Sequence, residues 1–232
     1  KVDNIHKLVR DVGRQKCALV TGDGGIDYSV DFSLQEPMSF RLLLAQVYAA
    51  LLLLQPGKAM VCKFFDMHER LTHELLWVIA VVFDDVHLVK PVTSRVANSE
   101  RYVVATGYRG CPKEVETVFR KVLYQWRTQW QLKSILHTPP PPSFLQAIHE
   151  YNEWYAEQQY HSIAECLRLI DAAVEGTPAA DIYSAPRPTP TYRPVRIRTN
   201  HKALEEELDA IERQQVVDAK EWCERYAVEQ QV

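Results

Sequence analysis

The order in which short apolar runs and helix-like segments alternate limits the possible folds most strongly. Apolar runs occupy residues 17–20, 59–65 and 86–89, and the first of them leads into a glycine-rich loop. The segments between these runs, residues 39–54 and 67–83, repeat apolar side chains at helical spacing. Strands that are joined through helices pair in parallel with right-handed crossovers. The pattern therefore predicts an α/β fold that contains half of an open sheet.

A fourth strand is predicted over residues 101–106, where apolar and polar side chains alternate. The short loop before it allows an antiparallel hairpin with the third strand at the edge of the sheet. Ser39 is expected to cap the first of the connecting helices. Pro112 suits the first turn of a later helix that extends to about Leu136. Functional groups in such a sheet gather at the carboxyl ends of its strands.

The chain divides into four predicted parts. A polyproline spacer at Pro139–Pro142 separates the α/β region from the C-terminal third of the chain. The parts are an α/β half domain over residues 1–137, a helical extension over 138–175, a Pro/Arg-rich linker over 176–200 and a C-terminal helix over 201–232.

Composition argues against several kinds of partner. The net charge of -3 gives no global basic signal, so contact with RNA would need a local patch. The five cysteines are scattered without a C-x-x-C pair, which disfavours a metal site and indicates a reducing compartment such as the cytoplasm or nucleus. The apolar run over residues 42–54 is about 13 residues long, whereas a membrane span needs about 20, so no membrane contact is expected.

Three ionisable residues stand at or beside the predicted strand ends. Asp23 follows the first strand, Lys63 lies inside the second, and Glu100 immediately precedes the fourth. A lysine in a buried strand is costly unless it is paired, and carboxylates from neighbouring strand ends would supply that pairing. Two interpretations fit equally well: a stabilising ion pair, or a lysine that is held as a general base. Lys90, after the third strand, is interpreted as a solvated strand-end charge, with a functional role as the less favoured alternative.

The segments around these residues resemble those of FtsJ-like methyltransferases. Residues 19–27 resemble the family's catalytic-aspartate loop, and residues 60–66 resemble its lysine strand. Residues 90–104 resemble its segment of Lys-Pro, Ser-Arg and Asn-Ser-Glu-x-Tyr. Order and spacing agree over about residues 14–110. The closest subgroup is the cap-type, or adrift-type, one, which has eukaryotic and large-DNA-virus members; a viral source would place the protein in the virion or the host cytoplasm.

The resemblance implies a Rossmann-like methyltransferase sheet that methylates a ribose 2′-hydroxyl of RNA, with capped mRNA as the expected substrate and S-adenosyl-L-methionine as the cofactor. The family uses a Lys-Asp-Lys-Glu tetrad, and Asp23, Lys63 and Glu100 match its last three members. By this match Lys63 is the general base that removes the hydroxyl proton, while Asp23 and Glu100 hold and tune it. The chemistry needs such a base because a 2′-hydroxyl is a poor nucleophile at neutral pH.

Two parts of the family pattern belong upstream of the matching stretch, namely the first tetrad lysine and the glycine-rich cofactor loop. Residues before Lys16 match neither, and the glycines around Asp23 belong to the aspartate loop. Asp23 is therefore the residue of this chain that is expected to contact the cofactor. A half sheet exposes an apolar edge, so an upstream polypeptide is expected to supply the missing half of the fold.

Residues beside Glu100 are candidates for RNA contact. Arg95, Asn98 and Ser99 could bind phosphate or ribose, or they could merely shape the loop. The arginine-rich tract over residues 187–202 could follow single-stranded RNA or serve as a linker. The alternative to an enzyme is a non-catalytic FtsJ-like structural or interaction module of a capping, polymerase or capsid assembly.

Overall fold

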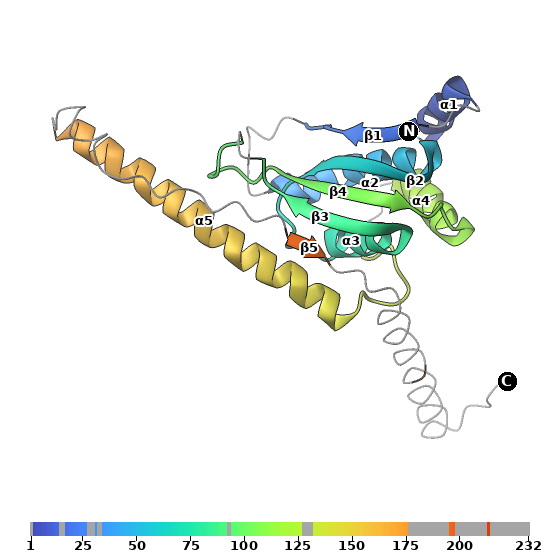
Figure 1. The fold of residues 1–232 in the computed structure, drawn as a ribbon. Helices are drawn as coiled ribbons and strands as arrows, with labels where there is room; N and C mark the ends of the chain where they lie inside the picture. Colours follow the sequence, from blue (N-terminus) through green and yellow to red (C-terminus); the bar gives the residue numbers. More distant parts are fainter. Residues whose placement is uncertain are drawn as a thin grey trace.

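The computed structural model describes residues 2–13, 17–26, 31, 34–91, 94–126, 132–175, 195–197 and 213. It consists of a mixed sheet, helices packed against the sheet, and one long helix that runs past the sheet (Figure 1). The elements in chain order are α1 (Val2–Val12), β1 (Cys17–Gly22), α2 (Gln35–Leu53), β2 (Leu54–Phe64), α3 (Arg70–Val82), β3 (Phe83–Val89), β4 (Arg101–Tyr108), α4 (Lys113–Gln125), α5 (Pro142–Val174) and β5 (Val195–Ile197).

The strands lie in the order β1-β2-β4-β3-β5. β1 and β2 pair in parallel, as predicted, and β3 and β4 form the predicted antiparallel hairpin. The expectation that β3 pairs with β2 is wrong, because β4 lies between them and is antiparallel to both. In that position β4 has hydrogen-bonded neighbours on both edges and buries Val103 and Ala105. β5 extends the sheet beyond β3, although it belongs to the segment for which the sequence predicts a linker.

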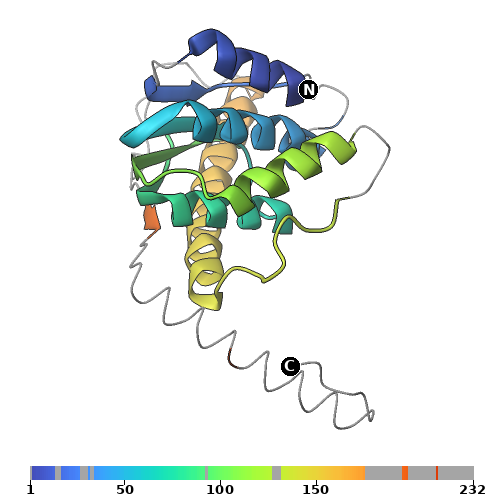
Figure 2. The ribbon, with the colours of Figure 1, turned by 90° about the vertical axis from the view of Figure 1, so that its right-hand side faces the viewer.

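Helix α2 is the central helix of the core. Its residues Leu44, Val47 and Tyr48 have no exposed surface, and α3 and α4 pack beside it. Figure 2 shows α2, α3 and α4 on one face of the sheet. By length and composition α2 could cross a membrane, but here its apolar side chains fill the protein core.

The start of α2 differs from the expectation. The helix begins at Gln35, and the Ser39 hydroxyl donates a hydrogen bond to the Gln35 carbonyl inside the first turn rather than capping it. Glu36 and Pro37 occupy this first turn. A carboxylate there interacts favourably with the helix dipole, and proline there has no intrahelical hydrogen bond to lose.

Helix α5 crosses the end of the sheet at which β1 and β2 finish (Figure 1). Its second half exposes a stripe of large apolar side chains: Tyr160, Ile163, Leu167, Ile170 and Val174. Helix α4 ends at Gln125, before the predicted end near Leu136. The predicted helix over 201–232 and most of the arginine-rich tract lie outside the described residues.

Candidate active site

Asp23 and Lys63 meet at the carboxyl ends of β1 and β2. The parallel register pairs Gly22 with Cys62, so the residues that follow them come side by side. The Lys63 ammonium lies 3.0 Å from Asp23 Oδ1 and donates a hydrogen bond of 3.3 Å to the Asp23 carbonyl. The Lys63 side chain is 16% exposed and that of Asp23 is 70% exposed, so the amine lies at the base of the site and the carboxylate at its rim.

Glu100 reaches this pair through Tyr102. The antiparallel register places Tyr102 of β4 opposite Lys63 of β2. The Tyr102 hydroxyl lies 2.7 Å from Glu100 Oε1 and 3.3 Å from Asp23 Oδ1. Burial, together with the two carboxylates, raises the pKa of Tyr102, so its hydroxyl stays neutral and available as a donor. The structure thus brings the three predicted residues together, with a tyrosine whose role the sequence motif did not reveal.

Gln46 of α2 fixes the aspartate loop. The Gly24 amide donates a hydrogen bond of 2.8 Å to Gln46 Oε1. A Cβ atom at Gly22 or at Gly24 would lie 2.9 Å from this same oxygen, closer than contacts of real Cβ atoms. The two glycines are therefore needed so that the loop can approach α2, and Gln46 is a supporting residue that its motif position did not identify.

A second lysine organises the loop before β4. Lys90 is buried, and its ammonium donates hydrogen bonds to the Asn98 carbonyl at 3.0 Å, to Asn98 Oδ1 and to the Glu100 carbonyl at 2.7 Å. Burial lowers the pKa of Lys90 to about 8, against the opposing effect of Glu100. The interpretation of Lys90 as a solvated strand-end charge is wrong, because it holds the backbone on which Glu100 stands.

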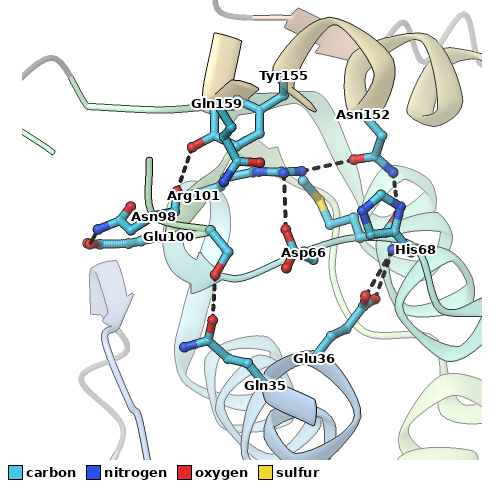
Figure 3. A network of polar contacts seen from close by, with 12 residues as sticks. Gln35, Glu36, Asp66, His68, Asn98, Glu100, Arg101, Asn152, Tyr155 and Gln159 are labelled. Atoms are coloured by element: carbon cyan, nitrogen blue, oxygen red, sulfur yellow. Dashed lines mark hydrogen bonds and ion pairs between the residues drawn. The ribbon is translucent and has the colours of Figure 1, made fainter. Parts of the chain in front are cut away.

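The three candidate RNA-contacting residues differ in their surroundings. Asn98 binds Lys90, and its Nδ2 lies 3.4 Å from Glu100 Oε2. The Ser99 hydroxyl donates a hydrogen bond to Gln35 Oε1 at the start of α2 (Figure 3). Both side chains therefore shape the loop, and all three residues line the cavity beside it.

The cavity beside Lys63 and Glu100 has a volume of about 620 Å³, within the range of small-molecule sites. It opens to solvent and is lined mainly by polar and charged side chains. The lining residues are Gln35, Lys63, Phe65, Asp66, Arg95, Ala97, Asn98, Ser99, Glu100 and Gln159. The lining holds two cations, two carboxylates and several amides and a hydroxyl, which suits a ligand with hydroxyl groups, while Arg95 could bind a phosphate.

Other reactive groups offer little chemistry here. Burial raises the pKa of the Cys62 thiol to about 12, so it is not a nucleophile at neutral pH. Within the described ranges, no group of three or more His, Cys, Asp or Glu side chains is placed to hold a metal ion.

Comparison with known proteins finds similarity to one family and to several of its members. Residues 1–108 match the family of FtsJ-like methyltransferases. The chain is 43% identical over 112 residues to cap-specific mRNA (nucleoside-2′-O-)-methyltransferase 1 of Trypanosoma cruzi, a match that covers 47% of this chain and 30% of that protein. It is 30% identical over 165 residues to the type 2 enzyme of Mus musculus, covering 71% of this chain and 21% of that protein.

A third relative carries a different description. The inactive cap-specific mRNA (nucleoside-2′-O-)-methyltransferase 1B of Caenorhabditis briggsae is 29% identical over 169 residues, covering 68% of this chain and 20% of that protein. In each of these three matches the aligned part is less than a third of the relative's length. Residues 1–108 thus carry an FtsJ-like methyltransferase domain that is homologous to the cap-specific mRNA 2′-O-methyltransferases.

Proposed function

We propose that this chain carries the catalytic residues of an RNA 2′-O-methyltransferase that acts on capped mRNA. The observation that carries the proposal is the position of Lys63. Its amine is held 3.0 Å from Asp23 at a strand end, and it lines a polar cavity of about 620 Å³. A base that faces a cavity of this size and lining is what proton removal from a ribose hydroxyl requires.

In the proposed mechanism, Nζ of Lys63 accepts the proton of the 2′-hydroxyl. The 2′-oxygen would then take up the methyl group that bound S-adenosyl-L-methionine supplies, with the methyl–sulfur bond breaking as the carbon–oxygen bond forms, and the proton would pass from Lys63 to solvent. Asp23 orients the amine through its carboxylate and its carbonyl. On the other side, the Tyr102 hydroxyl can donate to the carboxylate of Asp23 or to that of Glu100. Arg95, at the cavity wall, is placed to bind an RNA phosphate.

S-adenosyl-L-methionine is the proposed cofactor, and when bound it supplies the electrophilic methyl group. The residues around Lys63 fit such a donor. Gly25 leaves space in front of the amine, because a Cβ atom there would lie 3.7 Å from Lys63 Nζ. The 70% exposed carboxylate of Asp23 borders the same opening. Asp23, Gly24 and Gly25 are the residues of this chain that would face the methyl end of the cofactor.

Methyl transfer to a defined capped RNA tests the proposal. The intact protein is expected to label a capped oligoribonucleotide from labelled S-adenosyl-L-methionine. A matched capped oligonucleotide that has 2′-deoxyribose throughout is expected to stay unlabelled, because it lacks the hydroxyl that Lys63 would deprotonate. Equal labelling of both substrates would show that the methyl group goes to another position and would contradict the proposal.

A second candidate function is a non-catalytic module of a capping, polymerase or capsid assembly. Two observations favour it: one relative is described as inactive, and β1 forms an edge of the sheet on which Leu19 is 54% exposed. We propose that an upstream polypeptide covers this edge. Binding of S-adenosyl-L-methionine by the chain with that polypeptide supports the enzyme, and absence of binding with and without it supports the module.

A further inference from the structure

Helix α5 binds three consecutive backbone carbonyls of the loop that leads to Glu100. The Tyr155 hydroxyl lies 2.7 Å from the Asn98 carbonyl and 3.1 Å from the Val96 carbonyl. Gln159 Nε2 donates a hydrogen bond of 3.3 Å to the Ala97 carbonyl between them. Because the acceptors are backbone carbonyls, these contacts hold the backbone of the loop in place and do not depend on its side chains.

Lys90, at the end of β3, holds the same loop. The Asn98 carbonyl accepts hydrogen bonds from both the Lys90 ammonium and the Tyr155 hydroxyl. The Lys90 ammonium also lies 5.7 Å from the centre of the Tyr155 ring. The loop is therefore clamped between the end of β3 and the side of α5, two residues before Glu100.

Arg101 connects this clamp to the loop that follows Lys63. Its side chain is 1% exposed, and the guanidinium lies 3.8 Å from the centre of the Tyr155 ring. The guanidinium donates hydrogen bonds of 3.2 Å to Asp66 Oδ1 and 2.9 Å to Asn152 Oδ1. Asn152 of α5 in turn donates to the Met67 carbonyl. Figure 3 shows these side chains converging between α5 and the strand ends.

From these contacts we propose that Tyr155 is a positioning residue for the site at Lys63 and Glu100, and that α5 is a structural part of that site. Helix α5 lies outside residues 1–108, so the match to the family does not assign it this role. The inference rests on the proposed function. Its physical basis is that the 2.7 Å contact of Glu100 with the Tyr102 hydroxyl beside Asp23 requires a fixed loop, and small displacements of catalytic groups reduce rates strongly.

The test compares Tyr155→Phe with Tyr160→Phe in the intact protein. Tyr155→Phe removes the hydroxyl and keeps the ring that packs on Arg101. Tyr160 lies on the same helix and is 70% exposed, so the matched change there leaves the three loop carbonyls untouched. Tyr155→Phe is expected to lower kcat about 3- to 10-fold, as loss of a hydrogen bond implies, while the KM for S-adenosyl-L-methionine stays near that of the control.

Hydrogen exchange provides a readout that does not depend on activity. Amide exchange over residues 94–101 is expected to become faster in Tyr155→Phe and to stay unchanged in Tyr160→Phe. Equal kcat values and equal exchange in the two variants would overturn the positioning role even if the wild-type protein methylates RNA. If the wild-type protein transfers no methyl group, the proposed function fails, whereas the exchange comparison still decides whether Tyr155 holds the loop.

Discussion

Lys63 and Tyr102 face each other across the β2–β4 pair, and the tyrosine hydroxyl lies between the carboxylates of Glu100 and Asp23, either of which can accept its one proton. This relationship turns two separate strand ends into one site. Asp23 binds the amine directly, while Glu100 acts on it through a neutral hydroxyl. The charges of the site are therefore arranged as one ion pair with a second carboxylate behind a hydrogen-bonded bridge.

Replacing Tyr102 with phenylalanine is expected to lower kcat about 10- to 100-fold, since hydrogen bonds to charged groups contribute more than neutral ones. The loss is expected because Asp23 and Glu100 would no longer be connected. Tyr124→Phe is a matched control, because Tyr124 is 66% exposed on α4. Steady-state kinetics of both variants checks the prediction. Equal kcat values would show that Tyr102 has no role in the reaction.

Two neighbouring glycines are expected to respond differently to alanine. In Gly24→Ala the new Cβ would lie 2.9 Å from Gln46 Oε1, so the hydrogen bond that anchors the loop is displaced. The free energy of unfolding should fall by about 1 kcal/mol. In Gly25→Ala the new Cβ makes an ordinary contact at 3.7 Å from Lys63 Nζ, so stability should change by less than about 0.5 kcal/mol.

The rate of methyl transfer is also expected to respond to alanine at Gly25. Gly25→Ala fills the opening in front of Lys63 and is expected to reduce methyl transfer at least about tenfold. Denaturant unfolding and methyl-transfer assays together check both variants. A stable and fully active Gly25→Ala protein would show that the methyl donor does not approach from this side.

Lys90 is expected to make stability depend on alkaline pH. Burial lowers its pKa from 10.5 to about 8, so between these values the unfolded chain binds a proton that the folded chain does not. The free energy of unfolding should therefore rise with pH in this window, by up to about 1.4 kcal/mol per pH unit from this group. Below pH 8 both states bind the proton, and the contribution to the slope disappears.

The measurement is urea unfolding at pH about 8 and about 10 for the wild type and Lys90→Met. The wild type should gain stability relative to Lys90→Met as the pH rises. Lys58→Met is the control, because Lys58 is exposed on β2 and should leave the wild-type slope intact. Parallel curves for the wild type and Lys90→Met would mean that the pKa of Lys90 is the same in both states.

Much of the site can be predicted from sequence because its main residues stand next to strand ends. Asp23, Lys63 and Glu100 lie in or beside apolar runs that are visible in the sequence alone. The role of Tyr102 cannot be predicted in this way, because it depends on the register between β2 and β4. The sequence pattern predicts β4 at the edge of the sheet, whereas the structure has it between β2 and β3. The prediction fails because a short hairpin loop does not specify on which side of β3 the next strand will pair.

The part played by α5 also depends on tertiary structure. Nothing in the local sequence around Tyr155 indicates that its hydroxyl reaches the loop before Glu100, where its partner Asn98 is 57 residues away in the chain. Arg101 follows Glu100 in the chain, yet its burial between Asp66 and α5 becomes visible only when the helix lies across the strand ends. Contacts of high sequence separation of this kind carry no periodic signal.

The central claim is that Lys63 is the general base, and a comparison of Lys63→Ala with Lys58→Ala in the intact protein tests it most directly. Both changes remove a lysine from β2. Lys58 is exposed and lies nearer the start of the strand, whereas Lys63 lies at the end that meets Asp23. Lys63→Ala is expected to lower kcat for methyl transfer to capped RNA at least about 100-fold while it still binds S-adenosyl-L-methionine. The account is contradicted if Lys63→Ala retains the kcat of Lys58→Ala.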